Sequence, residues 1–214
     1  MARQVRSEAT RRKIIDAAID VFGEVGYAAA GWNTIIDRTG MTKGALYHHF
    51  DSKESLASSI IDEGSDAILV AFRNVCGSSS PALENMIHGT FMIANVLSSD
   101  KVARAAAQLT AALAGFNQAA ANFSASLIDL MAAQARRASA EGDLRQDFDP
   151  LVISESVVGA MFGTRLLSMA ISAKGRSGQH DRGEVSCGKG DSAGRLRVQI
   201  AAAASTTTPM PDRK

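Results

Sequence analysis

The residues between Thr42 and Lys53 have the types and the spacing needed to contact a nucleic acid. Thr42 and Lys43 open a short helical pattern, and Tyr47 and His48 project from the same predicted helix. Free backbone N–H groups and the dipole at a helix N-terminus favour a phosphate, and side chains there are the first to reach base edges. Phenol and imidazole groups can also hydrogen-bond phosphate oxygens. This tract therefore predicts a DNA-contacting element.

Further residues in this tract and at the N-terminus fit contact with a polyanion. Gly44 has no side chain to hold the backbone away from DNA, and Lys53 places a cation at the start of the next helix. Residues 3–13 hold five basic side chains, Arg3 among them, and Glu8 is the only acid there. Such a cluster is typical of an arm that lies along DNA, although a solvated N-terminus has the same composition.

A long helix is predicted in front of the tract. Apolar residues recur at helical spacing over residues 7–25. Ser7 and Glu8 supply a cap and a favourable charge at its start. Gly26 is expected to end this helix in the left-handed conformation.

Two short helices are predicted to carry the tract itself, over residues 32–38 and 43–50, and a glycine joins them. Thr42 caps the second, and Leu46 and Phe50, four positions apart, are expected to face inward. Two short helices behind a longer one form the layout of a helix-turn-helix.

The following chain is predicted to be helical as well. Helices are expected over residues 53–75, 81–98, 101–139 with a break near Gly115, and 150–173. No segment alternates apolar and polar residues long enough to predict a strand. Hydrophobic residues make up 46%, charged residues 21% and aromatic residues 5%. With the alanine content, this composition favours an all-α globular protein.

Charge and cysteine content narrow the function classes. The net charge of +1 is the sum of +2 in residues 1–50, −5 in residues 51–171 and +4 in the remainder. Cys76 and Cys187 are too few and too far apart for a disulfide framework or a zinc site, which favours the cytoplasm. No secretory signal is expected. The longest uncharged run, residues 105–128, contains several amides, so no membrane span is expected either.

The helix-turn-helix resembles a known family in its sequence. The run GMTKGALYHHF at residues 40–50, preceded by Gly26-Tyr27 and followed by SKESL at residues 52–56, is similar to the DNA-binding region of the TetR family of bacterial transcriptional regulators. The resemblance covers about residues 7–65. Together with Arg3-Gln4, the motif is most similar to the γ-butyrolactone receptor branch.

The resemblance implies a DNA-binding transcriptional regulator and not an enzyme. A homodimeric repressor would bind a palindromic operator in double-stranded DNA and would be released by a small apolar ligand, with no cofactor, metal or membrane. The expected domains are a three-helix DNA-binding domain over residues 1–52 and a helical ligand-binding and dimerisation domain over residues 53–173. Six glycines between 174 and 194 predict that residues 174–214 form a disordered tail. The residues expected to bind DNA are Arg3, Thr42, Lys43, Gly44, Tyr47, His48 and Lys53.

Aromatic, methionine and polar side chains on alanine-rich helices are the candidates for a ligand pocket. They are Phe91, Gln108, Phe116, Phe123, Met161, Phe162 and Arg165. An ordinary helical core without a cavity would use the same residues. Phe123 stands where the butyrolactone receptors are expected to have a tryptophan, so the ligand class stays open.

Three residues depart from the family pattern. Gly31 replaces the Ser or Thr that usually caps the second helix, which weakens this cap by a few tenths of a kcal/mol. Trp32 and Ile36 are bulkier than usual for their positions, and Trp32 is expected to pack rather than to contact the DNA backbone.

Two other function classes remain open from the sequence. Trp32 and Ile36 make a helical interaction protein without DNA binding conceivable. A small helical enzyme has only the pair Glu84 and His88 in its favour, since the chain contains neither G-x-S-x-G nor HExxH.

Overall fold

The computed structural model describes residues 2–77 and 81–178, and this part of the chain consists of eight helices without a strand. They are α1 (Ala2–Ala29), α2 (Trp32–Thr39), α3 (Lys43–His49), α4 (Lys53–Cys76), α5 (Ala82–Ser99), α6 (Lys101–Ala112), α7 (Gln118–Glu141) and α8 (Pro150–Gly178). The chain divides into two units, residues 1–166 and 167–214. All helices except the end of α8 belong to the first unit.

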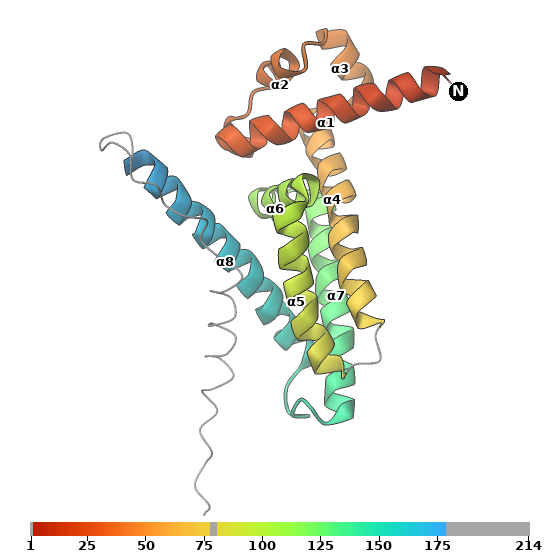
Figure 1. Cartoon of the computed structure of the whole chain (residues 1–214), viewed down its shortest axis with the longest axis vertical. Helices are drawn as coiled ribbons and strands as arrows, with labels where there is room; N and C mark the ends of the chain where they lie inside the picture. The colour runs from red at the N-terminus through yellow and green to blue at the C-terminus, as the bar shows by residue number, and fades with distance from the viewer. Residues whose placement is uncertain (1, 78–80, 179–214) are drawn as a thin grey trace, which may run out of the picture. The chain divides into compact units, whose positions relative to one another are not determined.

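The first three helices share one apolar core, as predicted. Leu46 of α3 and Phe50, the residue directly after α3, are buried together with Ile14 of α1 and Ile35 of α2. Figure 1 shows α2 and α3 on one side of α1. The buried side chains hold α3 by its inner face, so its outer face is free to contact a partner.

Local caps set the boundaries of these short helices. Gly40 ends α2 with a φ of 64°, and its N–H donates to the carbonyl of Asp37. The Thr42 side chain accepts a hydrogen bond from the Ala45 N–H and begins α3. Gly31 provides no side-chain cap for α2, as the sequence predicts. The end of α2 at Gly40 and the cap of α3 at Thr42 together determine where the turn between the two helices lies.

The beginning of α1 differs from the prediction. The helix includes Ala2 and passes through Ser7 without a break, because residues 2–6 contain no glycine or proline that would end it. Gly26 has the predicted positive φ, 78°, but its ψ of 160° is extended. It therefore kinks the chain, and one further helical turn follows before α2.

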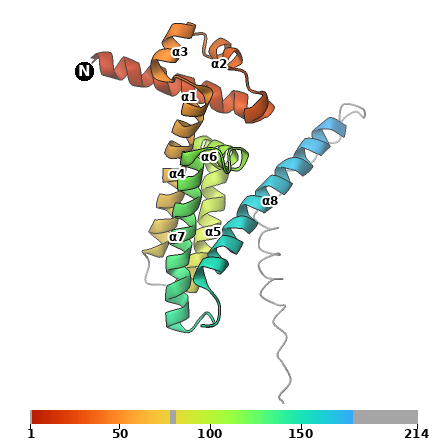
Figure 2. The same ribbon diagram turned by 180° about the vertical axis from the view of Figure 1, so that it is seen from behind.

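Helix α4 joins the first three helices to a helical bundle. It packs against α5, α6 and α7, and its first part contacts α1. Both views show α4 running beside α5 and α7, with α1 across the end near α6 (Figures 1 and 2). Gly64 permits this packing, because a Cβ there would lie 2.6 Å from the Ala106 Cβ of α6.

The remaining helix boundaries lie close to those predicted from the sequence. The expected break near Gly115 is present, with a φ of 83° at that residue and an Asn117 cap on α7. Helix α8 continues to Gly178, past the predicted boundary at residue 173, because no proline follows Pro150 within this stretch to end it. The rest of the predicted tail lies outside the described residues.

Candidate DNA interface and regulatory domain

Helix α3 presents the predicted contact residues on its outer face. Thr42, Lys43, Gly44 and His48 are exposed, and the Tyr47 side chain is 45% exposed. Since Leu46 between them is buried, the burial pattern separates an inner anchoring face from an outer polar face. The outer face carries one ammonium, two hydroxyls and one imidazole, which can bind phosphates and base edges.

Gly44 is not required by the fold. Its φ is not positive, and a Cβ built on it would meet no atom within 4 Å. A glycine in a helix costs about 0.5–1 kcal/mol relative to alanine, so the fold alone would favour a larger residue. The predicted close approach of DNA to α3 would account for a glycine at this position.

Aromatic contacts between α2 and α3 position the Tyr47 side chain on the outer face of α3. The Trp32 and Tyr47 rings meet edge to face with centroids 5.7 Å apart, and the Lys43 ammonium lies 5.8 Å from the Tyr47 ring centroid. Trp32 packs against the core, as predicted, with its buried Nε1 atom lacking a hydrogen-bond partner in the described part of the chain. The indole therefore limits the positions that Tyr47 can adopt.

Lys53 holds the turn that follows α1. Its ammonium donates to the backbone carbonyls of Tyr27 at 2.9 Å and Ala30 at 3.0 Å, and it lies 4.4 Å from the centroid of the Tyr27 ring. The sequence predicted a phosphate contact for Lys53 and missed this role, because both carbonyls belong to another helix end. The phosphate contact stays a prediction for its remaining N–H donor.

The N-terminal basic residues divide into different environments. The side chain of Arg3 lies outside the described residues, although its backbone belongs to α1. Arg11 lies 5.4 Å from the Phe50 ring centroid. Arg12 pairs with Glu63 of α4 and with Asp16, 3.5 Å away. Arg12 is therefore engaged within the protein, so it is less available to DNA than the charge count suggests.

The side chains of His48 and His49 contact each other. Their rings meet edge to face with centroids 5.4 Å apart, His48 exposed and His49 half-buried. Within the described ranges, no group of three or more His, Cys, Asp or Glu side chains could hold a metal ion.

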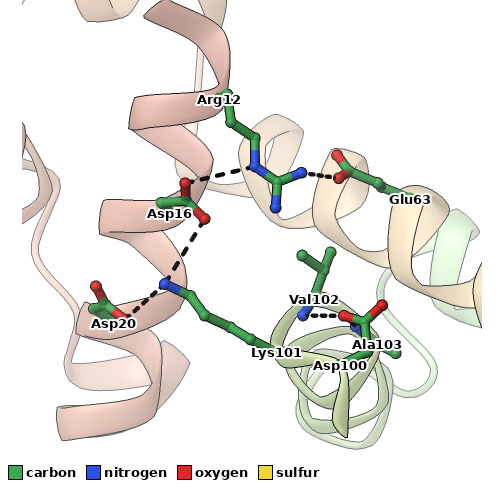
Figure 3. Close-up of polar contacts among 8 residues, drawn as sticks. All are labelled: Arg12, Asp16, Asp20, Glu63, Asp100, Lys101, Val102 and Ala103. Carbon is green, nitrogen blue, oxygen red and sulfur yellow. Dashed lines mark hydrogen bonds and ion pairs between the residues drawn. The ribbon is translucent and has the colours of Figure 1, made fainter. Parts of the chain in front are cut away.

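An ion-pair network joins α1 to α4 and α6 (Figure 3). The Lys101 ammonium lies 3.7 Å from an Asp16 oxygen and 3.1 Å from an Asp20 oxygen, and Arg12 connects Asp16 to Glu63. The Asp100 carboxylate accepts hydrogen bonds from two N–H groups and caps α6, which places Lys101 at the helix start. Apart from the Arg12–Asp16 pair, which is four residues apart on α1, the sequence offered no local signal for this network, since Glu63 and Lys101 lie far from α1 along the chain.

The predicted ligand residues do not all lie together. Phe123 of α7 is buried, and its ring meets that of Phe162 of α8 at 6.3 Å. Met161 and Arg165 are half-buried on α8. Phe116, in contrast, is 87% exposed in the turn before α7, so the structure does not bring it to the other aromatic residues.

The two remaining candidates are half-buried on other helices. Phe91 lies on α5, and Gln108 lies on α6. Gln108 lines a cleft between α6 and α1, which is a different place from the Phe123–Phe162 contact.

Two family models match the chain and cover both groups of helices. The model for bacterial regulatory proteins of the tetR family matches residues 14–60, and the tetracyclin repressor-like C-terminal domain matches residues 79–182. The first match spans the helix-turn-helix described above. The second spans the bundle from α5 to α8.

Known proteins agree with this assignment. The A-factor receptor protein of Streptomyces griseus is 33% identical over 174 residues, which are 81% of this chain but only 60% of that protein. The transcriptional repressor KstR2 of Rhodococcus jostii is 37% identical over 68 residues, 32% of this chain and 33% of that protein. A crystal structure of a gamma-butyrolactone receptor is 30% identical with a TM-score of 0.66, covering 76% of this chain and 81% of that one.

The residues matched by the first model include the whole of α3 and the buried positions that hold it. The chain belongs to the TetR family of bacterial regulatory proteins.

Proposed function

We propose that this regulator is a homodimeric repressor that binds a palindromic operator and is released by a small-molecule ligand. The observation that carries the proposal is the outer face of α3, where exposed Thr42, Lys43 and His48 surround the open position at Gly44. A helix with this face can enter the major groove without a steric obstacle from its own side chains. The enzyme and interaction-protein alternatives find no support among the regulators that this chain resembles.

The apolar surface of α8 supports a dimer. Leu151, Val152 and Leu166 are 44%, 56% and 51% exposed, and helical spacing puts them on one face. The stretch Pro150–Ser168 is also long and apolar enough to cross a membrane by length and composition alone. In a regulator that must reach DNA in the cytoplasm, contact with a second copy is the better use of this face. A dimer also matches the two half-sites of a palindrome.

The contact between α7 and α8 supports a ligand site with an apolar wall. Phe123 and Phe162 form an aromatic pair, and the flexible Met161 side chain lies next to it on α8. Two of the relatives are named as receptors for A-factor and for gamma-butyrolactone. We propose a small ligand with an apolar body for this chain as well, without assigning the lactone class.

The network around Lys101 supports a route from ligand to DNA. Helix α6 packs against α4 and α5 of the bundle, and its first residue pairs with Asp16 and Asp20 of α1. A ligand that moves α6 would therefore change the position of α1 and of the two helices it supports. Each of these ion pairs is exposed and weak, so a small displacement is enough to exchange partners.

A salt-dependent mobility-shift assay tests the proposal. The DNA is a palindromic fragment from upstream of the chain's own gene, and light scattering measures the subunit number of the same sample. We expect a dimer whose log affinity falls linearly with log salt, and Lys43→Ala should reduce this slope. Arg136→Ala, an exposed cation on α7, is the matched control and should not. A monomer, or a shift that is independent of salt, would contradict the proposal.

A further inference from the structure

The aromatic contact between α2 and α3 lies outside the buried core that holds these two helices. Ile35 of α2 and Leu46 of α3 anchor the helices and are completely buried. Trp32 is only half-buried at the edge of this core, and Tyr47 is 45% exposed. The helices therefore have their anchors elsewhere, and the contact between the two rings is not what holds them together.

The Tyr47 ring has two partners in this contact. The Trp32 indole meets it edge to face, with ring centroids 5.7 Å apart and an angle of 63° between the ring planes. The Lys43 ammonium comes from one helical turn earlier on α3 and lies 5.8 Å from the centroid of the Tyr47 ring. Both distances are within the range of attractive aromatic and cation–π contacts. A partly exposed tyrosine is thus held by an indole and an ammonium.

Hydrogen bonding is not the reason for a tryptophan at position 32. The Nε1 atom of Trp32 is buried, and it has no hydrogen-bond partner among the residues that the structure describes. A buried donor without an acceptor costs free energy, which a phenylalanine at the same place would avoid. What the tryptophan adds is a larger ring, and this ring contacts Tyr47.

A side chain that is held before binding favours the complex. An exposed side chain that becomes ordered only on binding loses rotamer freedom, and this loss weakens the complex. Tyr47 carries one of the two hydroxyls of the outer face of α3, and Lys43 carries its ammonium. Because the Lys43 ammonium lies near the same ring, holding Tyr47 prepares two of the predicted DNA contacts at once.

We infer that Trp32 is a positioning residue for DNA binding: its indole holds the Tyr47 ring, and through this ring the Lys43 ammonium, in place before α3 meets DNA. Trp32 acts through Tyr47 and does not itself contact the DNA. The effect on DNA affinity rests on the proposed function, whereas the contact between the two rings does not.

A double-mutant cycle on the full chain tests the inference. Mobility shifts on the palindromic fragment give the DNA affinities of the wild type, Trp32→Leu, Tyr47→Leu and the double variant. We expect Trp32→Leu to weaken binding by about tenfold when Tyr47 is present and by less than about twofold when Tyr47 is replaced. If Trp32 only stabilised the helices, its loss would weaken binding equally in both backgrounds, and that result would overturn the inference.

Trp32→Phe separates the ring contact from the indole N–H. Phenylalanine keeps an aromatic ring next to Tyr47 and removes the buried donor, so this variant should bind DNA within about threefold of the wild type. A loss as large as that of Trp32→Leu would mean that the N–H group itself contacts DNA, contrary to the inference.

Phe148→Leu is the matched control for loss of an exposed ring near a cation. Phe148 is 50% exposed and its ring centroid lies 5.3 Å from the Arg145 guanidinium, but it belongs to the loop between α7 and α8. This variant should leave DNA affinity unchanged. Thermal melting verifies that each variant is folded at the temperature of the assay.

Tryptophan fluorescence measures the ring contact without DNA, because Trp32 is the only tryptophan of the chain. Tyr47→Leu removes the ring beside the indole, so we expect emission at longer wavelength and stronger quenching by acrylamide than in the wild type. Unchanged emission and quenching would show that the two rings do not meet in solution and would overturn the inference.

The inference and the proposed function fail in different ways. A wild-type chain that does not bind the fragment would refute both, even if the fluorescence change were present. Equally tight DNA binding by the wild type and Trp32→Leu would refute the inference alone.

Discussion

Replacing Lys53 with methionine should destabilise the DNA-binding helices. The change keeps most of the aliphatic side chain but removes the ammonium that donates to Tyr27 and Ala30 at 2.9 and 3.0 Å. Hydrogen bonds from charged donors contribute about 1.5–3 kcal/mol each when well shielded. Lys53 is half-buried, and water can hydrate the released carbonyls, so the two hydrogen bonds together contribute about as much as one well-shielded bond, about 2 kcal/mol.

The expected loss is therefore about 2 kcal/mol for the two hydrogen bonds, with the contact to the Tyr27 ring adding about 0.5 kcal/mol. For a chain of this size, each kcal/mol lowers the melting temperature by about 2–4 °C. Lys53→Met should thus melt about 5–10 °C below the wild type. The turn held by Lys53 leads into α2, so DNA affinity should fall together with the melting temperature.

Lys43→Met is the matched control. Lys43 is also a lysine close to a tyrosine ring, but it is exposed and its ammonium donates no hydrogen bond within the described residues. This variant should melt with the wild type while its DNA binding becomes less dependent on salt, by about one unit of slope for each phosphate that the variant no longer neutralises. Circular dichroism gives the melting curves, and mobility shifts at several salt concentrations give the slopes.

One result would contradict the positioning role of Lys53. If Lys53→Met melted with the wild type and reduced the salt slope as Lys43→Met does, the ammonium would bind phosphate and its hydrogen bonds to the two carbonyls would carry little energy.

Three further predictions, which use four substitutions, test other parts of the molecule. Gly44→Ala should raise the free energy of unfolding by about 0.5–1 kcal/mol but weaken DNA binding. The control Gly23→Ala should raise the free energy of unfolding by a similar amount without changing DNA affinity. Equal DNA affinity of the two variants would show that DNA does not approach α3 closely. Leu46→Ala should cost about 2–5 kcal/mol and lower the melting temperature and DNA affinity together, and an unchanged melting curve would contradict its burial. Lys101→Met should change the free energy of unfolding by less than about 1 kcal/mol, because the ion pairs of Lys101 are exposed. The variant should nevertheless speed hydrogen exchange in α1 around residues 16–20. Unchanged exchange would mean that the ion-pair network does not hold α1.

The exposed position of Phe116 illustrates what the sequence left open about the regulatory helices. Its type and its place on an alanine-rich segment resemble those of Phe123, and the sequence predicts a pocket role for both. The turn at Gly115 directs Phe116 to solvent, while the Asn117 cap starts a helix that buries Phe123. Which of two similar side chains is buried depends on the direction of the chain after the turn.

Local sequence was enough to predict most of the helices and the orientation of α3. Thr42 as a cap, Gly26 as the end of the regular helix and the inward direction of Leu46 all follow from neighbours within a few residues. Interactions of this kind have the same partners in every conformation that forms the helix. The predicted start of α1 was wrong for a related reason, since a possible cap at Ser7 does not stop a helix that can continue without strain.

The use of the charged side chains, in contrast, became clear only from the packed helices. Lys53 donates to carbonyls 23 and 26 positions away, and Arg12 pairs with Glu63 across 51 positions. A lysine or arginine can serve a phosphate, a carbonyl or a carboxylate equally well by its chemistry. Its partner is chosen by which helices pack together, and that depends on the burial of apolar side chains along the whole chain rather than on the residues beside it.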